Sequence, residues 1–173
     1  GGRYFGVVSG LDMNSVIAVT GASGFVGQRL CQAFAESNQS VRGVVRTSNA
    51  VSPIAGMEFV AVGDIDEATD WSAALNCVNC VIHCAARTHV MHEIEADALA
   101  AYRAVNVDGT RRLGEQMATA GARRLVYLSS IKVNGEQTAL GAPFLFSDAP
   151  APEDPYGISK WEAEKALLEV SAK

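Results

Sequence analysis

A tyrosine and a lysine are four residues apart in the segment Tyr156-Gly-Ile-Ser-Lys160. Residues four apart lie on the same face of a helix, so we expect the two side chains to project together. A phenol has an ordinary pKa of ~10 and is a poor base at neutral pH, but a nearby ammonium favours the phenolate. The pair therefore indicates a proton-transfer site. Since the spacing also occurs by chance, the alternative is a surface pair on an amphipathic helix.

A glycine-rich loop, Thr20-Gly-Ala-Ser-Gly-Phe-Val-Gly27, lies between an expected strand at Val16–Val19 and an expected helix at Phe25–Ser37. Its glycines permit a tight turn, close approach of the backbone to a pyrophosphate, and close packing of helix on strand. The loop predicts a bound dinucleotide, whose nicotinamide would exchange hydride while the tyrosine exchanges the proton. The alternative is a glycine-rich turn without a ligand. The expected cofactor contacts are Gly21, Gly24, Phe25, Val26 and Gly27.

The rest of the chain alternates apolar strands with helical patterns. Beyond the first strand and helix, strands are expected at Val41–Val45, Glu58–Val62, Cys77–His83 and Arg124–Ser129. Helices are expected at Asp66–Leu75, with Asp66 as N-cap, at Glu93–Ala120, ended by Gly121, and from Pro155 onward. This alternation predicts a doubly wound parallel α/β sheet of the Rossmann type. The long connection 131–154 begins where such sheets bind ligands, so we expect it to be functional.

The second expected strand ends in Arg46, where an NAD-preferring dehydrogenase usually carries Asp or Glu. A guanidinium there suits a 2′-phosphate, so Arg46 favours NADP over NAD. Stacking of Arg46 on the adenine, or simple solvation, stays open as an alternative.

Composition limits the class of protein. The 173 residues carry a net charge of -5 and no basic stripe, which argues against nucleic acid as a partner. No apolar run is long enough to cross a bilayer. Residues 1–12 are glycine-rich and precede Met13, so we expect a leader or cloning remnant there and one NAD(P)-binding domain over 13–173.

Four cysteines are present, and three of them cluster with a histidine in the run Cys77-Val-Asn-Cys80-Val-Ile-His83-Cys84. No second Cys/His pair completes four zinc ligands, so we expect no metal. The run is typical of a buried strand with free thiols. A reducing cytoplasm is therefore the expected location.

The order of these motifs resembles the extended short-chain dehydrogenase/reductases, and in particular the NAD-dependent epimerase/dehydratase family of UDP-glucose 4-epimerase-like nucleotide-sugar enzymes. The loop has the spacing G-x-x-G-x-x-G, and Ser129-Ser-Ile-Lys-Val-Asn-Gly135 resembles the family's Ser-Ser/Thr-x-x-Val-Tyr-Gly segment. The resemblance covers residues 16 to 172. Asn134 departs from the family's usual Tyr.

The resemblance implies roles for further residues. It makes Ser130 the third catalytic member beside Tyr156 and Lys160, and it leaves Ser129 structural. It implies that Asn106 distorts the long helix and supports Lys160 through water. His83 is expected to be structural. The further cofactor contacts that it implies are Asp64 and Ile65 at the adenine, and Ala85 and Ala86 beside the nicotinamide ribose.

The residues after Ser130 narrow the reaction. Dehydratases of the family carry Asp-Glu there, whereas this chain has Ile131 and Lys132, which cannot form a carboxyl acid/base pair. The resemblance thus implies 4-epimerisation or 4-keto reduction of a nucleotide-activated sugar in surface-polysaccharide synthesis. A reductase of a non-sugar ketone and a non-enzymatic dinucleotide sensor are the alternatives.

Family members are longer than this chain, so we expect it to be an N-terminal portion that lacks the C-terminal substrate domain and turns over poorly alone. The resemblance also implies a homodimer that packs through the long helix and the catalytic helix.

Overall fold

The computed structural model describes residues 16–48, 54–88, 97–138 and 140–172. Within them, a five-stranded parallel sheet has the order β3-β2-β1-β4-β5. The order reverses between β1 and β4, which is where doubly wound sheets bind ligands at the carboxyl ends of their strands. The predicted Rossmann-type sheet is confirmed. The strands are β1 (Val16–Thr20), β2 (Val41–Val45), β3 (Glu58–Ala61), β4 (Val78–His83) and β5 (Arg124–Tyr127).

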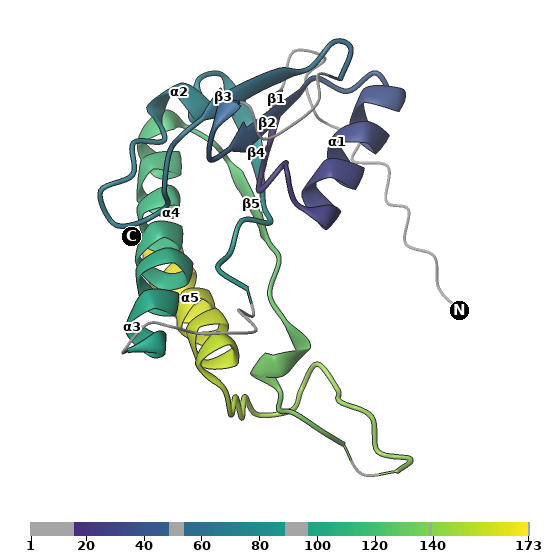
Figure 1. The fold of residues 1–173 in the computed structure, drawn as a ribbon, viewed down its shortest axis with the longest axis vertical. Coiled ribbons are helices and arrows are strands. Elements are labelled where there is room, and N and C mark those ends of the chain that lie inside the picture. The colour runs from purple at the N-terminus through teal and green to yellow at the C-terminus, as the bar shows by residue number, and fades with distance from the viewer. Residues whose placement is uncertain (1–15, 49–53, 89–96, 139, 173) are drawn as a thin grey trace.

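Helices cover both faces of this sheet. Figure 1 shows α1 on one side, with α4 and α5 side by side on the other. Between α3 and α4 the helix passes through one π-helical turn, η2, and η3 is a short 3-10 turn. The helical segments are α1 (Phe25–Glu36), α2 (Ser72–Leu75), α3 (Ala98–Arg103), η2 (Ala104–Asp108), α4 (Gly109–Ala120), η3 (Ile131–Val133) and α5 (Pro155–Ser171).

The core has two parts because successive strand residues point to opposite faces. In β1, Ile17 and Val19 pack with Cys31 of α1. Ala18 points the other way and packs with Leu113 of α4 and Trp71. Both α1 and α4 are therefore anchored to the central strand, whose carboxyl end leads into the glycine loop.

The expected helix Asp66–Leu75 is wrong over its first half, since α2 begins at Ser72. The Asp66 carboxylate accepts the N–H of Ala68 at 2.8 Å, and the Asp70 carboxylate accepts the N–H of Ser72 at 2.9 Å. Such local side-chain bonds offer the backbone an alternative to helix. The helix was predicted from the spacing of apolar residues, and this spacing carries no information about the two turns.

The sequence predicted that Cys77 is a buried strand residue, and this prediction is wrong. It is exposed, its φ is 59°, and β4 begins one residue later. All four cysteines are free, with Cys31 and Cys80 buried and Cys84 half-buried. The predicted strand was too long by one residue because the turn after α2 needs a left-handed position there.

The expected helix Glu93–Ala120 is interrupted. Its described part begins at Ala98, where the Asp97 carboxylate caps it by accepting the N–H of Ala100, and it changes to π-helical geometry at η2. Gly121 ends it in the left-handed conformation, with φ of 79°, as predicted. The rest of that expectation, and the leader 1–12, lie outside the described residues.

Arg42 ties the edge of the sheet to α2 from a side chain that is largely buried. Its Nε donates to Glu58 of β3 at 2.8 Å, and its terminal nitrogen donates to the carbonyls of Ala74 and Asn76 at 3.1 and 2.7 Å. Carbonyls at a helix end have no partner within the helix, so Arg42 satisfies them.

We expect Arg42→Met to lower the free energy of unfolding by about 1–3 kcal/mol, because these carbonyls lose a charged donor. Arg46→Met is the matched control, since the Arg46 side chain is 76% exposed and its loss is expected to change stability by less than about 0.5 kcal/mol. Urea unfolding measures both. Equal effects of the two variants would contradict this role for Arg42.

Candidate active site

The glycine loop packs so closely against the segment after β4 that a residue with a side chain would not fit at Gly21. Gly21 has φ of +65°, and a Cβ there would lie 2.8 Å from the Ala85 nitrogen. A Cβ on Gly27 would lie 2.2 Å from the Gly21 carbonyl oxygen. The expected tight turn at Gly21 is thus observed, and Gly27 lets the first turn of α1 pack closely against the glycine loop itself.

The N-terminus of α1 is open toward the same edge. Gly24 is its N-cap, and no described side chain caps the helix. The next two residues, Phe25 and Val26, are apolar yet 86% and 42% exposed. Free amides at the positive end of a helix fit a pyrophosphate, and exposed apolar side chains fit a surface that a ligand covers. These residues therefore fit a dinucleotide.

The ends of β2 and β3 bring Arg46 and Asp64 together. Arg46 Nε lies 3.1 Å from a carboxylate oxygen of Asp64, and both side chains are mostly exposed. Ile65 beside them is half-buried and fits against Gly109 of α4, where a Cβ would lie 2.3 Å from its side chain. An acid and a base thus share the position expected to contact the adenosine.

His83 forms a buried link between three elements. Hydrogen bonds join its Nδ1 to the Thr20 hydroxyl at 2.6 Å and its Nε2 to the Thr110 hydroxyl at 3.0 Å. Burial, helped by the nearby Lys160 charge, lowers the pKa of His83 to about 3, so the imidazole is neutral. Thr20 also accepts the N–H of Ala85 at 3.1 Å. These contacts are those of a structural residue.

Asn106 occupies the π-helical turn, where the resemblance implied a local distortion. Its amide oxygen accepts the N–H of Arg87 at 2.8 Å, and its amide nitrogen donates to the Arg87 carbonyl at 3.0 Å and the Ser159 hydroxyl at 2.9 Å. The buried amide therefore joins the segment after β4 to α5, next to Lys160. π-turns often mark functional sites because they re-aim a side chain.

The structure brings Ser130 and Tyr156 together. Ser130 caps η3, and Tyr156 is in the first turn of α5. Burial raises the pKa of Tyr156, and a hydrogen bond from Ser130 opposes this rise. The Tyr102 ring packs edge-on against Tyr156, with 6.1 Å between ring centroids. The phenol thus has a hydroxyl partner and an aromatic neighbour.

Lys160 is 2% exposed, and its ammonium lies 4.0 Å from the centre of the Tyr127 ring. Burial lowers the pKa of Lys160 to about 8, against the opposing charge of Glu164. The sequence missed Tyr127 as a neighbour of this amine. It also missed Lys132, whose charge lowers the pKa of Tyr156.

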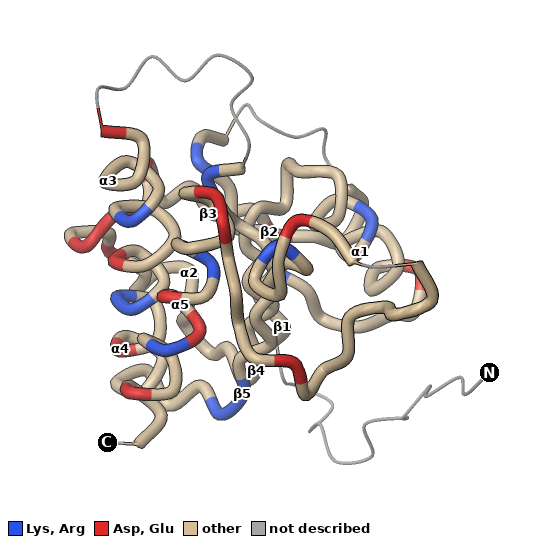
Figure 2. Tube along the Cα trace, turned by 90° about the horizontal axis from the view of Figure 1, so that it is seen from below, with Lys and Arg blue, Asp and Glu red and all other residues tan. Residues whose placement is uncertain are grey.

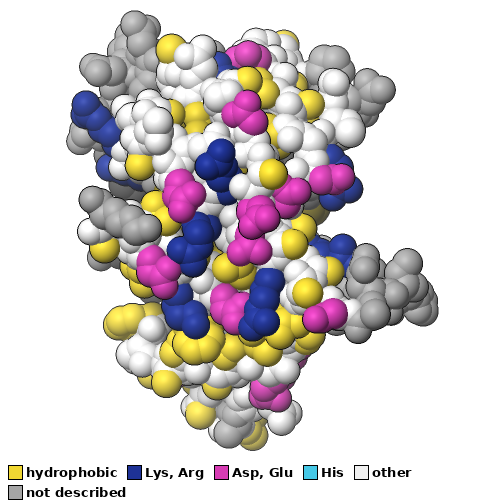
Figure 3. All heavy atoms as spheres, turned by 90° about the vertical axis from the view of Figure 1, so that its left-hand side faces the viewer, with side chains coloured by type: hydrophobic (Ala, Val, Ile, Leu, Met, Phe, Trp, Pro, Cys, Tyr) yellow, Lys and Arg dark blue, Asp and Glu magenta, His cyan; other side chains and the backbone are white. Residues whose placement is uncertain are grey.

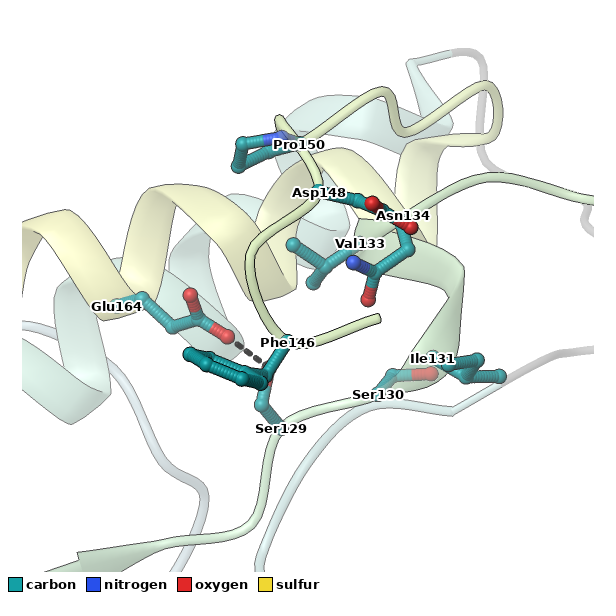
Figure 4. Close-up of a pocket in the computed structure, with 9 residues that line it drawn as sticks. All are labelled: Ser129, Ser130, Ile131, Val133, Asn134, Phe146, Asp148, Pro150 and Glu164. Atoms are coloured by element: carbon teal, nitrogen blue, oxygen red, sulfur yellow. Dashed lines mark hydrogen bonds between the residues drawn. The ribbon is translucent and has the colours of Figure 1, made fainter. Parts of the chain in front are cut away.

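A cavity of about 470 Å³ opens beside Ser130. Figure 4 shows the lining residues around the hollow, with the Ser129 hydroxyl bonded to the Glu164 carboxylate. Ile131 and Phe146 at its rim are strongly exposed apolar side chains. Sequence patterns gave no signal for Phe146 or Glu164, because these residues come close to Ser129 and Ser130 only when the chain is folded. The lining residues are Ser129, Ser130, Ile131, Val133, Asn134, Phe146, Asp148, Pro150 and Glu164.

Over the described ranges, no group of three or more His, Cys, Asp or Glu side chains is arranged to hold a metal ion. None of the described helices has the length and apolar character needed to span a membrane.

Known proteins are similar to this chain in sequence and fold. A model of the NAD dependent epimerase/dehydratase family matches residues 17–173. The chain is 45% identical over 160 residues to a UDP-glucose 4-epimerase of Vibrio cholerae, covering 92% of this chain and 48% of that protein. It is 31% identical to an N-acetyl-alpha-D-glucosaminyl-diphospho-ditrans,octacis-undecaprenol 4-epimerase of Escherichia coli O157:H7, covering 91% and 44%.

Among solved structures, that of MoeE5 in complex with UDP-glucose and NAD superposes with a TM-score of 0.78 at 30% identity. The match covers 92% of this chain and 50% of that one. The chain thus spans about half the length of the curated relatives it matches.

The buried amine of Lys160 predicts a pH-dependent stability. Its pKa is about 8 when folded and 10.5 when unfolded, so between these values only the unfolded state keeps the proton. Stability contributed by this group therefore rises with pH across that window, by roughly 3 kcal/mol. We expect wild type to gain this amount relative to Lys160→Met between pH 7 and 10.5 in urea unfolding. A constant difference between the two proteins would show that the amine keeps its ordinary pKa.

Proposed function

Because the chain belongs to the NAD-dependent epimerase/dehydratase family, we propose that it carries the cofactor-binding and catalytic half of a nucleotide-sugar 4-epimerase. The observation that carries the proposal is that Ser130 and Tyr156 meet at the carboxyl edge of the sheet that also carries the glycine loop. The 45% identity to a UDP-glucose 4-epimerase supports a UDP-sugar as substrate.

In the proposed reaction, Tyr156 accepts the proton of the sugar 4-hydroxyl and later returns it to the 4-keto oxygen. The Ser130 hydroxyl donates to the phenolate and orients the reacting oxygen. Lys160 is held beside Tyr127 and contributes an amine whose protonation changes near neutral pH. Bound NAD supplies the hydride acceptor and donor.

The proposal excludes sugar 4,6-dehydration. Ile131 is apolar, and the Lys132 ammonium lies 2.6 Å from Asp154. Neither side chain can act as the carboxyl acid/base pair that elimination of water requires. Redox chemistry at one carbinol, with turnover of the 4-keto sugar between the two hydride transfers, is the reaction that the described residues support.

We expect Tyr156→Phe to lower UDP-glucose-dependent reduction of NAD by at least ~100-fold, because the phenol oxygen that takes the proton is lost. NAD affinity should stay within about threefold, a change of only ~0.7 kcal/mol. The readout is the transient absorbance of the reduced cofactor after rapid mixing with UDP-glucose, because an epimerase returns the hydride to the sugar.

Tyr102→Phe is the matched control, because it keeps the ring against Tyr156 and removes the hydroxyl that donates to the Thr88 carbonyl. Its rate should stay near that of wild type. An unchanged rate in Tyr156→Phe would argue for a dinucleotide sensor.

We infer that the cofactor is NAD. The sequence alone favoured NADP through Arg46, but Asp64 lies 3.1 Å from that guanidinium and offsets its charge. A carboxylate at this edge accepts ribose hydroxyls and repels a 2′-phosphate. The complex of MoeE5 with NAD also supports this assignment.

Titration with NADH and NADPH tests the cofactor. We expect NADH to bind roughly tenfold more tightly, a difference of about 1.4 kcal/mol. Asp64→Asn should remove most of that preference, since the amide keeps the shape and loses the charge. Clear preference of the wild type for NADPH would restore Arg46 as a phosphate ligand.

We also propose a homodimer that packs through the α3–α4 and α5 helices. Figure 3 shows charges of both signs interspersed over this face. Two ion pairs cross it, from Arg103 to Glu162 at 2.6 Å and from Arg111 to Glu169 at 2.8 Å. A mixed-charge surface is compatible with a second copy of itself.

The free state of Cys31, Cys77, Cys80 and Cys84 is compatible with a reducing compartment, and we propose the cytoplasm as the location.

A further inference from the structure

One carboxylate joins the two short segments that carry the serine and the tyrosine. Asp154, the N-cap of α5, accepts the Gly157 N–H at 2.6 Å through one oxygen. Its other oxygen lies 2.6 Å from the ammonium of Lys132 in η3. The ion pair therefore connects η3 directly to the first turn of α5.

The two segments also touch through their backbones. A Cβ on Gly157 would lie 2.7 Å from the Lys132 carbonyl oxygen and 3.1 Å from the Asp154 carboxylate. Ser130 caps η3 two residues before Lys132, and Tyr156 lies two residues after Asp154. The distance between the serine hydroxyl and the phenol therefore depends on how η3 and α5 are joined.

We propose that Lys132 is a positioning residue, whose ion pair with Asp154 holds the Ser130 hydroxyl against the Tyr156 phenol. This inference rests on the proposed proton-transfer role of Tyr156. Lys132 itself contacts neither substrate nor cofactor in this assignment. It acts through Asp154 and through the backbone of η3.

The charges around Tyr156 agree with this role. The Asp154 carboxylate raises the pKa of Tyr156, and the Lys132 ammonium lowers it. The effects of the two paired charges on the phenol therefore oppose each other. Loss of Lys132 leaves Asp154 uncompensated and raises the pKa of Tyr156. The other groups that face the phenol are Ser130 beside η3, Tyr102 of α3 and Tyr127 of β5.

The chain offers a matched control in Glu136. This residue also accepts from Lys132, at 2.8 Å, but from the exposed side of the lysine. Glu136→Gln therefore removes a charge partner of Lys132 while leaving its bond to Asp154. A purely superficial ion-pair network would respond similarly to the loss of either carboxylate.

The test is a double-mutant cycle on the pKa of Tyr156. This pKa is measured by NMR titration of the chain carrying tyrosine labelled with 13C at Cζ. The Tyr156 signal is identified by its loss in Tyr156→Phe. In the wild-type background, Ser130→Ala should raise the pKa of Tyr156, because the phenolate loses its donor. In the Lys132→Met background, the same change should have little further effect, because the serine is already displaced.

Two further variants separate charge from position. Lys132→Arg should restore the wild-type pKa and the effect of Ser130→Ala, since a guanidinium can pair with the same carboxylate. Asp154→Asn keeps a helix-capping side chain, lowers the pKa of Tyr156, and should also weaken the effect of Ser130→Ala. Glu136→Gln should change neither quantity.

An equal effect of Ser130→Ala in the wild-type and Lys132→Met backgrounds would overturn the inference. So would a Glu136→Gln response equal to that of Lys132→Met. Failure of the proposed function gives a different result, namely Tyr156→Phe with an unchanged rate of NAD reduction. If that function holds, Lys132→Met should slow hydride transfer by roughly tenfold or more, with NAD affinity unchanged.

Discussion

The contact between the glycine loop and the end of β4 fixes the positions of the other site residues. Gly21 and Ala85 are so close that no side chain fits between them, and Thr20 accepts the N–H of Ala85. From Ala85 the chain runs to Arg87, whose backbone is held by Asn106. Asn106 in turn holds Ser159, next to Lys160 on α5. One run of backbone and buried polar contacts thus connects the glycine loop to α5, which Figure 2 shows beside α4.

Local signals were sufficient to predict the sheet, the glycine loop and the left-handed end at Gly121, because each depends on neighbouring residues. Long-range contacts were not predictable from patterns. Nothing near Lys132 in sequence indicates that it pairs with Asp154, twenty-two residues later. The predictions of a strand at Cys77 and of a helix from Asp66 were wrong, because turns and local side-chain hydrogen bonds compete with regular structure at these positions. For the candidate site, the sequence motifs named Ser130, Tyr156 and Lys160, but not the neighbours that shift their pKa values, such as Lys132 and Glu164.

Burial shifts the pKa values of Tyr156 and Lys160, both on α5, in opposite directions. It lowers the pKa of Lys160 and raises that of Tyr156, so the uncharged form of each is favoured. A neutral amine and a neutral phenol cost less to bury than an ammonium and a phenolate. The positive nicotinamide ring of an oxidised cofactor would shift this balance toward the phenolate. In the proposed reaction, part of the activation of Tyr156 would therefore come from the cofactor.

The π-helical turn η2 changes how the helix between residues 98 and 120 is to be compared with relatives. One additional residue per turn rotates everything that follows by about 100° relative to a continuous α-helix. Tyr102 before the turn, Asn106 within it and Leu113 after it are all buried. Removing one residue of η2 would rotate α3 by about 100° relative to α4, so the two helices could not both keep their present inward faces. Insertions and deletions in this segment are therefore constrained by phase, and an alignment gap placed here would misassign the inward face of a whole helix.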